Sequence, residues 1–329
     1  MVLLAGFCIV SPAVAMHASQ QLAIVVNADD PQSKRIADYY QIKRGIPDEN
    51  VIWVNLPADK KSIGRKKFEQ VYQQVKSSTP SHIQFYALAW SQPFKVGCMS
   101  ITSAFAFGYD EAWCAQGCNS TRQSAYFNSA TRKPYSELGI RPAMMLAGSS
   151  VEQARDMIDR GVAADASYPK GTAYLVSTSD KARNVRSHFY PLVVDKLGKR
   201  INIQVEETDA LTGRDDVLFY ITGLAQVDRI DSNRYVNGAI ADHLTSAGGV
   251  LFGGSQMSIL RWLEAGATAS YGTVVEPCAF PQKFPHPAIV IDRYTRGETL
   301  IEAYWKSVAW PGQGLFVGEP LAAPFAGII

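Results

Sequence analysis

Residues 248–287, GGVLFGGSQMSILRWLEAGATASYGTVVEPCAFPQKFPHP, decide the fold that the sequence predicts. An apolar run at 250–252 ends at Gly253-Gly254, and a helical pattern follows until Gly266. The next run, 267–275, consists of small and β-branched residues without alternation, which is typical of a parallel strand covered on both faces. The stretch therefore predicts a βαβ unit.

The rest of the chain alternates in the same way. We expect further strands at 21–27, 51–56, 83–89, 143–146, 172–177, 201–206 and 216–222. Helical patterns cover 31–45, 64–77, 151–161, 181–196, 238–246 and 298–308. Strands that alternate with amphipathic helices predict an α/β protein, with a mainly parallel sheet, helices on both faces and right-handed crossovers.

The alternation lapses once. Residues 91–141 hold three cysteines and several aromatic residues, and they are longer than an ordinary connection. We interpret them as a cysteine-containing insertion between a first half, 19–90, and a second half, 142–329. The 329 residues suffice for one large α/β domain, which we place at 19–329.

The first residues predict a signal peptide over 1–18. Residues 2–15 are apolar and uncharged, and Ala13-Val14-Ala15 has the small-x-small form of a signal-peptidase site. A buried first strand is the alternative. No later segment reaches the roughly 18 apolar residues that a membrane-spanning helix needs. We expect a periplasmic or extracellular protein without a transmembrane segment once the leader is removed.

Charge argues against several classes of partner. The net charge is +2, with acidic and basic residues interspersed, so we expect neither nucleic acid nor an anionic membrane as partner. The sequence contains neither GxxxxGKS nor GxGxxG. We therefore expect no nucleotide cofactor, and we predict no other cofactor.

Four cysteines remain after the leader: Cys98, Cys114, Cys118 and Cys278. An even set in an oxidising compartment predicts disulfides, and three connectivities are open. A metal site is the weaker alternative, because the CxxxC spacing of Cys114 and Cys118 has no second pair or neighbouring histidine.

Cys278 is also the candidate nucleophile. It follows Glu276-Pro277 at the predicted carboxyl end of a parallel strand, where ligands bind in such sheets. A reactive thiolate needs a base, which His243 or His286 would supply, with Glu276 orienting it. A disulfide half or a packed thiol is the alternative.

Ligand-binding candidates lie in the same stretch. We expect Ser255, Gln256 and Thr273 to contact a ligand in a cleft beside Glu276 and Gln256. Ser255 follows a glycine pair, but GGSQM departs from the GxSxG nucleophile turn, so a helix N-cap is the alternative role.

Two acidic residues lie in the first half. Asp29 and Asp30 follow the first predicted strand, and capping of the next helix accounts for one of them.

Several blocks resemble a family of exported bacterial proteins that occurs in species with exosortase-type protein sorting. They include DPQSKRIADYYQIKRGIP at 30–47, KGTAYLVSTSDKARNVR at 170–186 and the end of the stretch quoted first. The resemblance covers essentially the whole mature chain. It implies a compartment and a genomic setting, since that family has no established activity.

A more distant resemblance is to the gingipain-type cysteine peptidases of the caspase-like clan, through the order of elements and the tail GLFVGEPL at 314–321. In that clan a His-Gly pair follows one strand and the nucleophilic cysteine follows the next. We expect the corresponding strand ends here at Thr222-Gly223 and Gly254-Ser255, where both signature residues are missing. The resemblance implies a caspase/gingipain-like core without the peptidase dyad.

Three functions compete at this point. We rank first a degenerate relative that binds a peptide, an envelope protein or another ligand at the carboxyl edge of the sheet, in envelope protein sorting or surface polymer assembly. The enzyme alternative is a thiol hydrolase or transpeptidase that uses Cys278. The third is a structural envelope component, which needs neither a pocket nor a free thiol.

Overall fold

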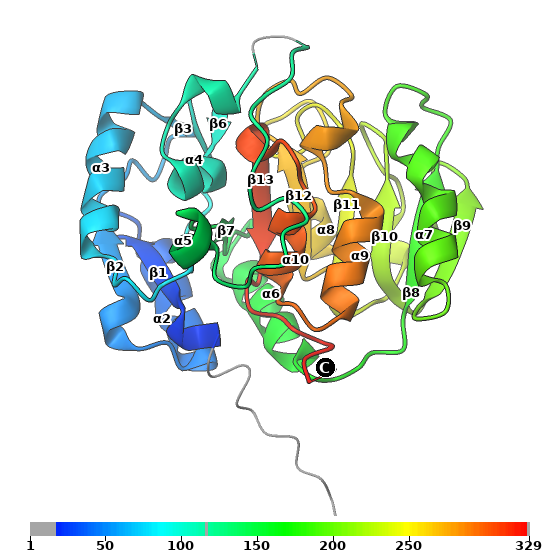
Figure 1. Ribbon diagram of the computed structural model, residues 1–329, viewed down its shortest axis with the longest axis horizontal. Coiled ribbons are helices and arrows are strands. Elements are labelled where there is room, and N and C mark those ends of the chain that lie inside the picture. The colour runs from blue at the N-terminus through cyan, green and yellow to red at the C-terminus, as the bar shows by residue number, and fades with distance from the viewer. Residues whose placement is uncertain (1–17, 116–117, 328–329) are drawn as a thin grey trace, which may run out of the picture.

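A ten-stranded sheet forms the centre of the protein, with the strand order β2-β1-β4-β7-β13-β12-β11-β10-β8-β9 (Figure 1). The computed structural model describes residues 18–115 and 118–327, so the predicted leader, apart from Ala18, lies outside the described residues. The strands of the sheet are β1 (Leu22–Asn27), β2 (Val51–Val54), β4 (Phe85–Leu88), β7 (Ala143–Met145), β8 (Thr172–Ser177), β9 (Asn202–Glu207), β10 (Val217–Thr222), β11 (Tyr235–His243), β12 (Ala269–Thr273) and β13 (Gly314–Gly318).

Most neighbouring strands are parallel. The strands β2, β1, β4 and β7 pair in parallel, and β12, β11, β10, β8 and β9 form a second parallel group. Between the two groups, β13 pairs antiparallel with β12 and meets β7 through one residue pair, Val317 with Met145. The predicted α/β class with a mainly parallel sheet is therefore confirmed.

Helices cover both faces of the sheet. They are α2 (Pro31–Arg44), α3 (Arg65–Ser78), α4 (Ile101–Phe107), α5 (Pro134–Leu138), α6 (Val151–Ala164), α7 (Tyr190–Leu197), α8 (Leu260–Glu264), α9 (Pro287–Thr295) and α10 (Leu300–Lys306). Two neighbours on β10 show the two layers: Phe219 contacts Tyr294 of α9, whereas Tyr220 contacts Trp262 of α8. Successive side chains of a strand point to opposite faces, so α9 and α8 lie on opposite sides of the sheet.

A βαβ unit exists as β11, α8 and β12, but its first strand was predicted in the wrong place, and so was the helix expected before it. Residues 238–246 were expected to form a helix, and they belong mostly to β11. Residues 250–252 were expected to form a strand, and they form a loop between β11 and α8. The alanine-rich run around Ile240 suits a helix by local preference, but burial between two helical layers decides in favour of a strand.

The insertion is ordered by short elements. Its strands β5 (Lys95–Val96) and β6 (Met99–Ser100) join β3 (Ser62–Ile63) in a three-stranded sheet, and α4 packs on β7 and β13. The insertion also packs closely against the segment before β13. A side chain at Gly312 would overlap the carbonyl oxygen of Trp113, so this contact requires glycine. Among the described residues, no helix is both long and apolar enough to cross a bilayer.

Candidate functional site

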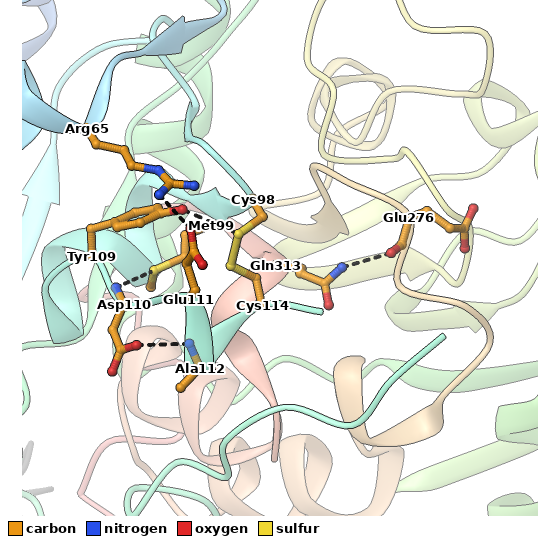
Figure 2. Close-up of a disulfide and its surroundings, with 10 residues drawn as sticks. All are labelled: Arg65, Cys98, Met99, Tyr109, Asp110, Glu111, Ala112, Cys114, Glu276 and Gln313. Atoms are coloured by element: carbon orange, nitrogen blue, oxygen red, sulfur yellow. Dashed lines mark hydrogen bonds and ion pairs between the residues drawn. A yellow bond between two sulfur atoms is a disulfide. The ribbon is translucent and has the colours of Figure 1, made fainter. Parts of the chain in front are cut away.

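Two disulfides account for the four cysteines. Cys98 bonds to Cys114 within the insertion (Figure 2), and Cys118 bonds to Cys278 across 160 residues of sequence. The sulfur of Cys278 is therefore not a thiol in this structure. The arrangement expected for a thiol hydrolase, with a free Cys278 beside a histidine, is not formed.

His243 is buried at the end of β11, and both of its ring nitrogens are engaged. The indole N–H of Trp262 donates to His243 Nδ1 at 2.9 Å, so the other nitrogen, Nε2, carries the proton and donates to the carbonyl oxygen of Met257 at 3.1 Å. Burial lowers the pKa of His243 to about 3. Both ring nitrogens therefore bond within the loop after β11 and α8, and neither bonds to Cys278.

Glu276 and His286 also have local roles. The Glu276 carboxylate accepts a hydrogen bond from the backbone N–H of Cys278 at 2.7 Å, which stabilises the left-handed backbone of Cys278, φ 49°. Gln313 Nε2 donates to the Glu276 carbonyl oxygen at 2.8 Å (Figure 2). His286 precedes α9, and its ring lies 4.3 Å from that of Phe189, centroid to centroid.

The three predicted ligand-binding residues differ in position. Ser255 is exposed, and it does not cap α8, which begins at Leu260. Gln256 Oε1 accepts from Thr245 Oγ1 at 2.8 Å, and Thr273 Oγ1 donates to the carbonyl oxygen of Thr245 at 3.2 Å. Gln256 and Thr273 therefore fix the backbone around Thr245.

One of the two strand ends that we compared with the caspase-like clan, Gly254-Ser255, was predicted in the wrong place. The strand that follows β10 in the chain and pairs with it is β11, which ends at His243 and continues into Leu244-Thr245. The second strand end is therefore not Gly254-Ser255, because 250–252 form no strand.

A cavity of about 460 Å³ lies where β1, β4 and β7 end. Its walls come from the start of α2, from the loop after β2, from the segments that follow β4 and β7, and from the loop after β11. The residues that line it are Asp30, Gln32, Ile36, Ala58, Asp59, Trp90, Ser91, Gln92, Gly148, Ser149 and Phe252. It is not lined by Glu276 or Gln256, so it is not the cleft predicted beside those residues.

Asn27 shapes the side of the cavity after β1. The buried Asn27 Nδ2 donates to the carbonyl oxygen of Leu56, and its Oδ1 accepts from the N–H groups of Leu56 and Asp29. These bonds hold the loop after β2 against the turn after β1. Asp30 then caps α2 by accepting from the N–H of Gln32 at 2.8 Å, with proline at the first helical position.

The opposite side is built around Ser91 and Gly148. Ser91 Oγ donates to the Gly148 carbonyl oxygen at 2.9 Å and joins the segment after β4 to the segment after β7. Ser150 caps α6, so the amino ends of α2 and α6, each 14 residues long, both lie at the cavity. A side chain at Gly148 would overlap the backbone N–H of Ala154, so this close approach requires glycine.

The cavity lies at a topological switch point of the sheet. β1 lies between β2 and β4 in the sheet. The connection from β1 therefore leads to the strand on one side of it, and the next strands of the sheet, β4 and β7, are added on its other side. In open α/β sheets ligands bind outside the carboxyl ends of strands at such a point. Lys61 Nζ lies 3.5 Å from the Gly253 carbonyl oxygen, and this contact brings the loop with Phe252 over the cavity.

The electrostatics of the cavity are mixed. The amino ends of two helices favour negative charge, whereas the carboxylates of Asp30 and Asp59 favour positive or hydrogen-bond-donating groups. A hydrogen bond from Lys60 lowers the pKa of Asp59. The lining otherwise offers amides at Gln32 and Gln92 and hydroxyls at Ser91 and Ser149 beside two aromatic rings.

Only part of this site was visible in the sequence. Asp30 stands at the end of the first predicted strand. Trp90, Gln92 and Ser149 carry no motif that points to binding, although the predicted strands 83–89 and 143–146 end beside them. Among protein-family models, curated proteins and solved structures, none matches this chain.

Proposed function

We propose that this chain is an exported, envelope-associated binding protein that holds a peptide or another polar ligand in the cavity at the ends of β1, β4 and β7. The observation that carries the proposal is the position of the cavity at the switch point of a mainly parallel sheet. The proposed role is in envelope protein sorting or surface polymer assembly. The exosortase setting and the caspase/gingipain-like identity of the core stay predictions.

The chemistry of the lining supports binding over nucleophilic catalysis. The lining residues, all of them in the described part of the chain, include no cysteine, histidine or lysine. Carboxylates and amides can instead accept hydrogen bonds from the N–H groups of a peptide or the hydroxyls of a sugar. The half-buried ring of Phe252 offers an apolar wall, and such a mixture is typical of ligand pockets.

Export is supported by the two disulfides. Disulfides form and persist in oxidising compartments, and the bond between Cys118 and Cys278 joins the insertion to the loop after β12.

Affinity selection tests the proposed function. The protein is incubated with a library of tripeptides and with one of short oligosaccharides, and retained compounds are identified by mass spectrometry. The test variant is Ser149→Trp, which replaces an exposed residue of the lining with a side chain that fills the opening. The control is Ser81→Trp, which places the same side chain in an exposed turn before β4, away from the cavity.

We expect the wild-type protein and the Ser81→Trp control to retain the same compounds, and Ser149→Trp to bind them at least about tenfold more weakly, as expected when a bound group is sterically displaced. Retention of nothing from either library would contradict the proposal and favour a structural envelope component. Equal retention by Ser149→Trp would place binding elsewhere.

A further inference from the structure

A second cavity, of about 250 Å³, lies near the amino ends of β4 and β7, at the opposite edge of the sheet from the candidate site. Its lining comes from α3, β4, α4, α5 and the residue two positions before β7. The side chains that matter are Tyr72, Lys76, Tyr86, Phe105, Tyr135 and Arg141.

Arg141 is held rigidly in the wall of this cavity. The side chain is 5% exposed, and its Nε donates to the carbonyl oxygen of Ile83 at 3.0 Å. The guanidinium carbon lies 3.2 Å from the centroid of the Tyr135 ring, which stacks on it. Two anchors therefore fix the plane of the guanidinium group, so a ligand would meet a preorganised cation.

No carboxylate balances this cation within residues 18–115 and 118–327. The ion pairs of that part of the chain, taken at distances up to 4.0 Å, include neither Arg141 nor Lys76. Arg44 and Arg186 also have side chains that are more than nine-tenths buried, and each of them pairs with a carboxylate. A buried charge is normally paired, because loss of water without a counter-charge is unfavourable.

Hydroxyl groups complete the lining. Burial raises the pKa of Tyr72, so its phenol stays protonated and can donate a hydrogen bond at neutral pH. Tyr86 OH donates to Thr79 Oγ1 at 2.8 Å, because Thr79 Oγ1 itself donates to the carbonyl oxygen of Val75, so the proton of Tyr86 is already used. A guanidinium group, an ammonium group and the phenolic hydroxyl of Tyr72 around one small cavity are the donors that oxyanions prefer.

We propose that this cavity binds a compact oxyanion, a phosphate or a carboxylate group, between Arg141 and Lys76. The planar fork of arginine matches both anions, and the volume suits one such group and not a large molecule. The site is separate from the cavity at the ends of β1, β4 and β7, so the two proposals can fail independently.

Calorimetric titration tests the site, with sodium phosphate and sodium acetate as the two probes at constant ionic strength. Lys76→Ala removes an exposed cation of the cavity, and Lys199→Ala removes another exposed lysine, which lies outside the cavity. Arg141→Gln removes the buried cation, and near-ultraviolet circular dichroism checks that this variant is folded.

We expect saturable binding of at least one probe at a single site, and the stronger of the two identifies the anion class. Lys76→Ala should weaken that binding about two- to fivefold, as expected for an exposed charge. A folded Arg141→Gln should weaken it about tenfold or more. Lys199→Ala should leave it unchanged.

Failure of both phosphate and acetate to bind the wild-type protein would overturn the proposal. So would equal losses in Lys76→Ala and Lys199→Ala, because the attraction would then be that of any surface lysine. If Arg141→Gln does not fold, the affinities of Lys76→Ala and Lys199→Ala for the anion still decide whether the cavity binds it.

Discussion

Arg186 Nη1 lies 2.5 Å from Asp242 Oδ1, and both side chains are 1% exposed. The pair joins the segment before α7 to β11, and further bonds surround it: Arg186 Nη2 donates to the carbonyl oxygen of Thr222, and Tyr304 OH lies 3.1 Å from Asp242 Oδ2. Burial raises the pKa of Asp242, an effect that Arg186 opposes. A buried ion pair thus fixes the carboxyl ends of β10 and β11.

We predict that Asp242→Ala lowers the free energy of unfolding by about 3–5 kcal/mol, because it leaves Arg186 buried and unpaired. Urea denaturation measures this. Asp180→Ala is the matched control, since it breaks the partly exposed pair with Arg183 and should cost about 0–1 kcal/mol. The double variant Arg186→Met/Asp242→Leu should be more stable than Asp242→Ala. Equal costs for the two aspartate variants would show that the buried pair contributes no more than an exposed one.

His243 predicts a particular dependence of stability on pH. Its pKa is about 3 in the folded protein against an ordinary 6.5, so between these values only the unfolded chain takes up the proton. The stability that this residue contributes is therefore complete above pH 6.5 and decreases as the pH falls, by up to about 1.4 kcal/mol per pH unit. Protonation of Nδ1 would also abolish the bond from Trp262.

The measurement is the free energy of unfolding from pH 7.5 to 5, for the wild-type protein and for His243→Gln. The glutamine keeps one acceptor and one donor but does not titrate, so its stability should fall less over this range. Parallel curves for the two proteins would contradict the buried neutral imidazole.

The two disulfides should contribute unequally. Loop-closure entropy gives roughly 3 kcal/mol for Cys98–Cys114 and roughly 5 kcal/mol for Cys118–Cys278, because 16 residues separate the first pair and 160 the second. We expect Cys118→Ala/Cys278→Ala to lower the free energy of unfolding more than Cys98→Ala/Cys114→Ala. The reverse order would contradict this pairing.

Mass-spectrometric peptide mapping without reduction checks the same bonds. We expect Cys118 and Cys278 in one linked peptide pair and no free thiol at Cys278. A free thiol there would restore the nucleophile alternative.

The sequence was sufficient for the α/β class because buried parallel strands such as β10 read as continuous apolar runs. It failed at β11, where Ala239 and Ala241 suit a helix locally and only the covering helices favour a strand. Disulfide pairing was open because it depends on distance in space, which brings Cys118 to Cys278. The cavity was missed for the same reason, since its walls come from five separate segments.

The most direct test of the central claim is the resonance of the Trp90 indole N–H in a nuclear magnetic resonance titration with a compound retained in the affinity selection. Trp90 lines the cavity, whereas Trp310 packs against Phe280 in the loop that holds Cys278, with ring centroids 5.7 Å apart. We predict that the Trp90 resonance shifts with saturation while that of Trp310 stays unchanged. A shift of Trp310 with Trp90 unchanged would contradict the account and return the site to the loop around Glu276 and Cys278.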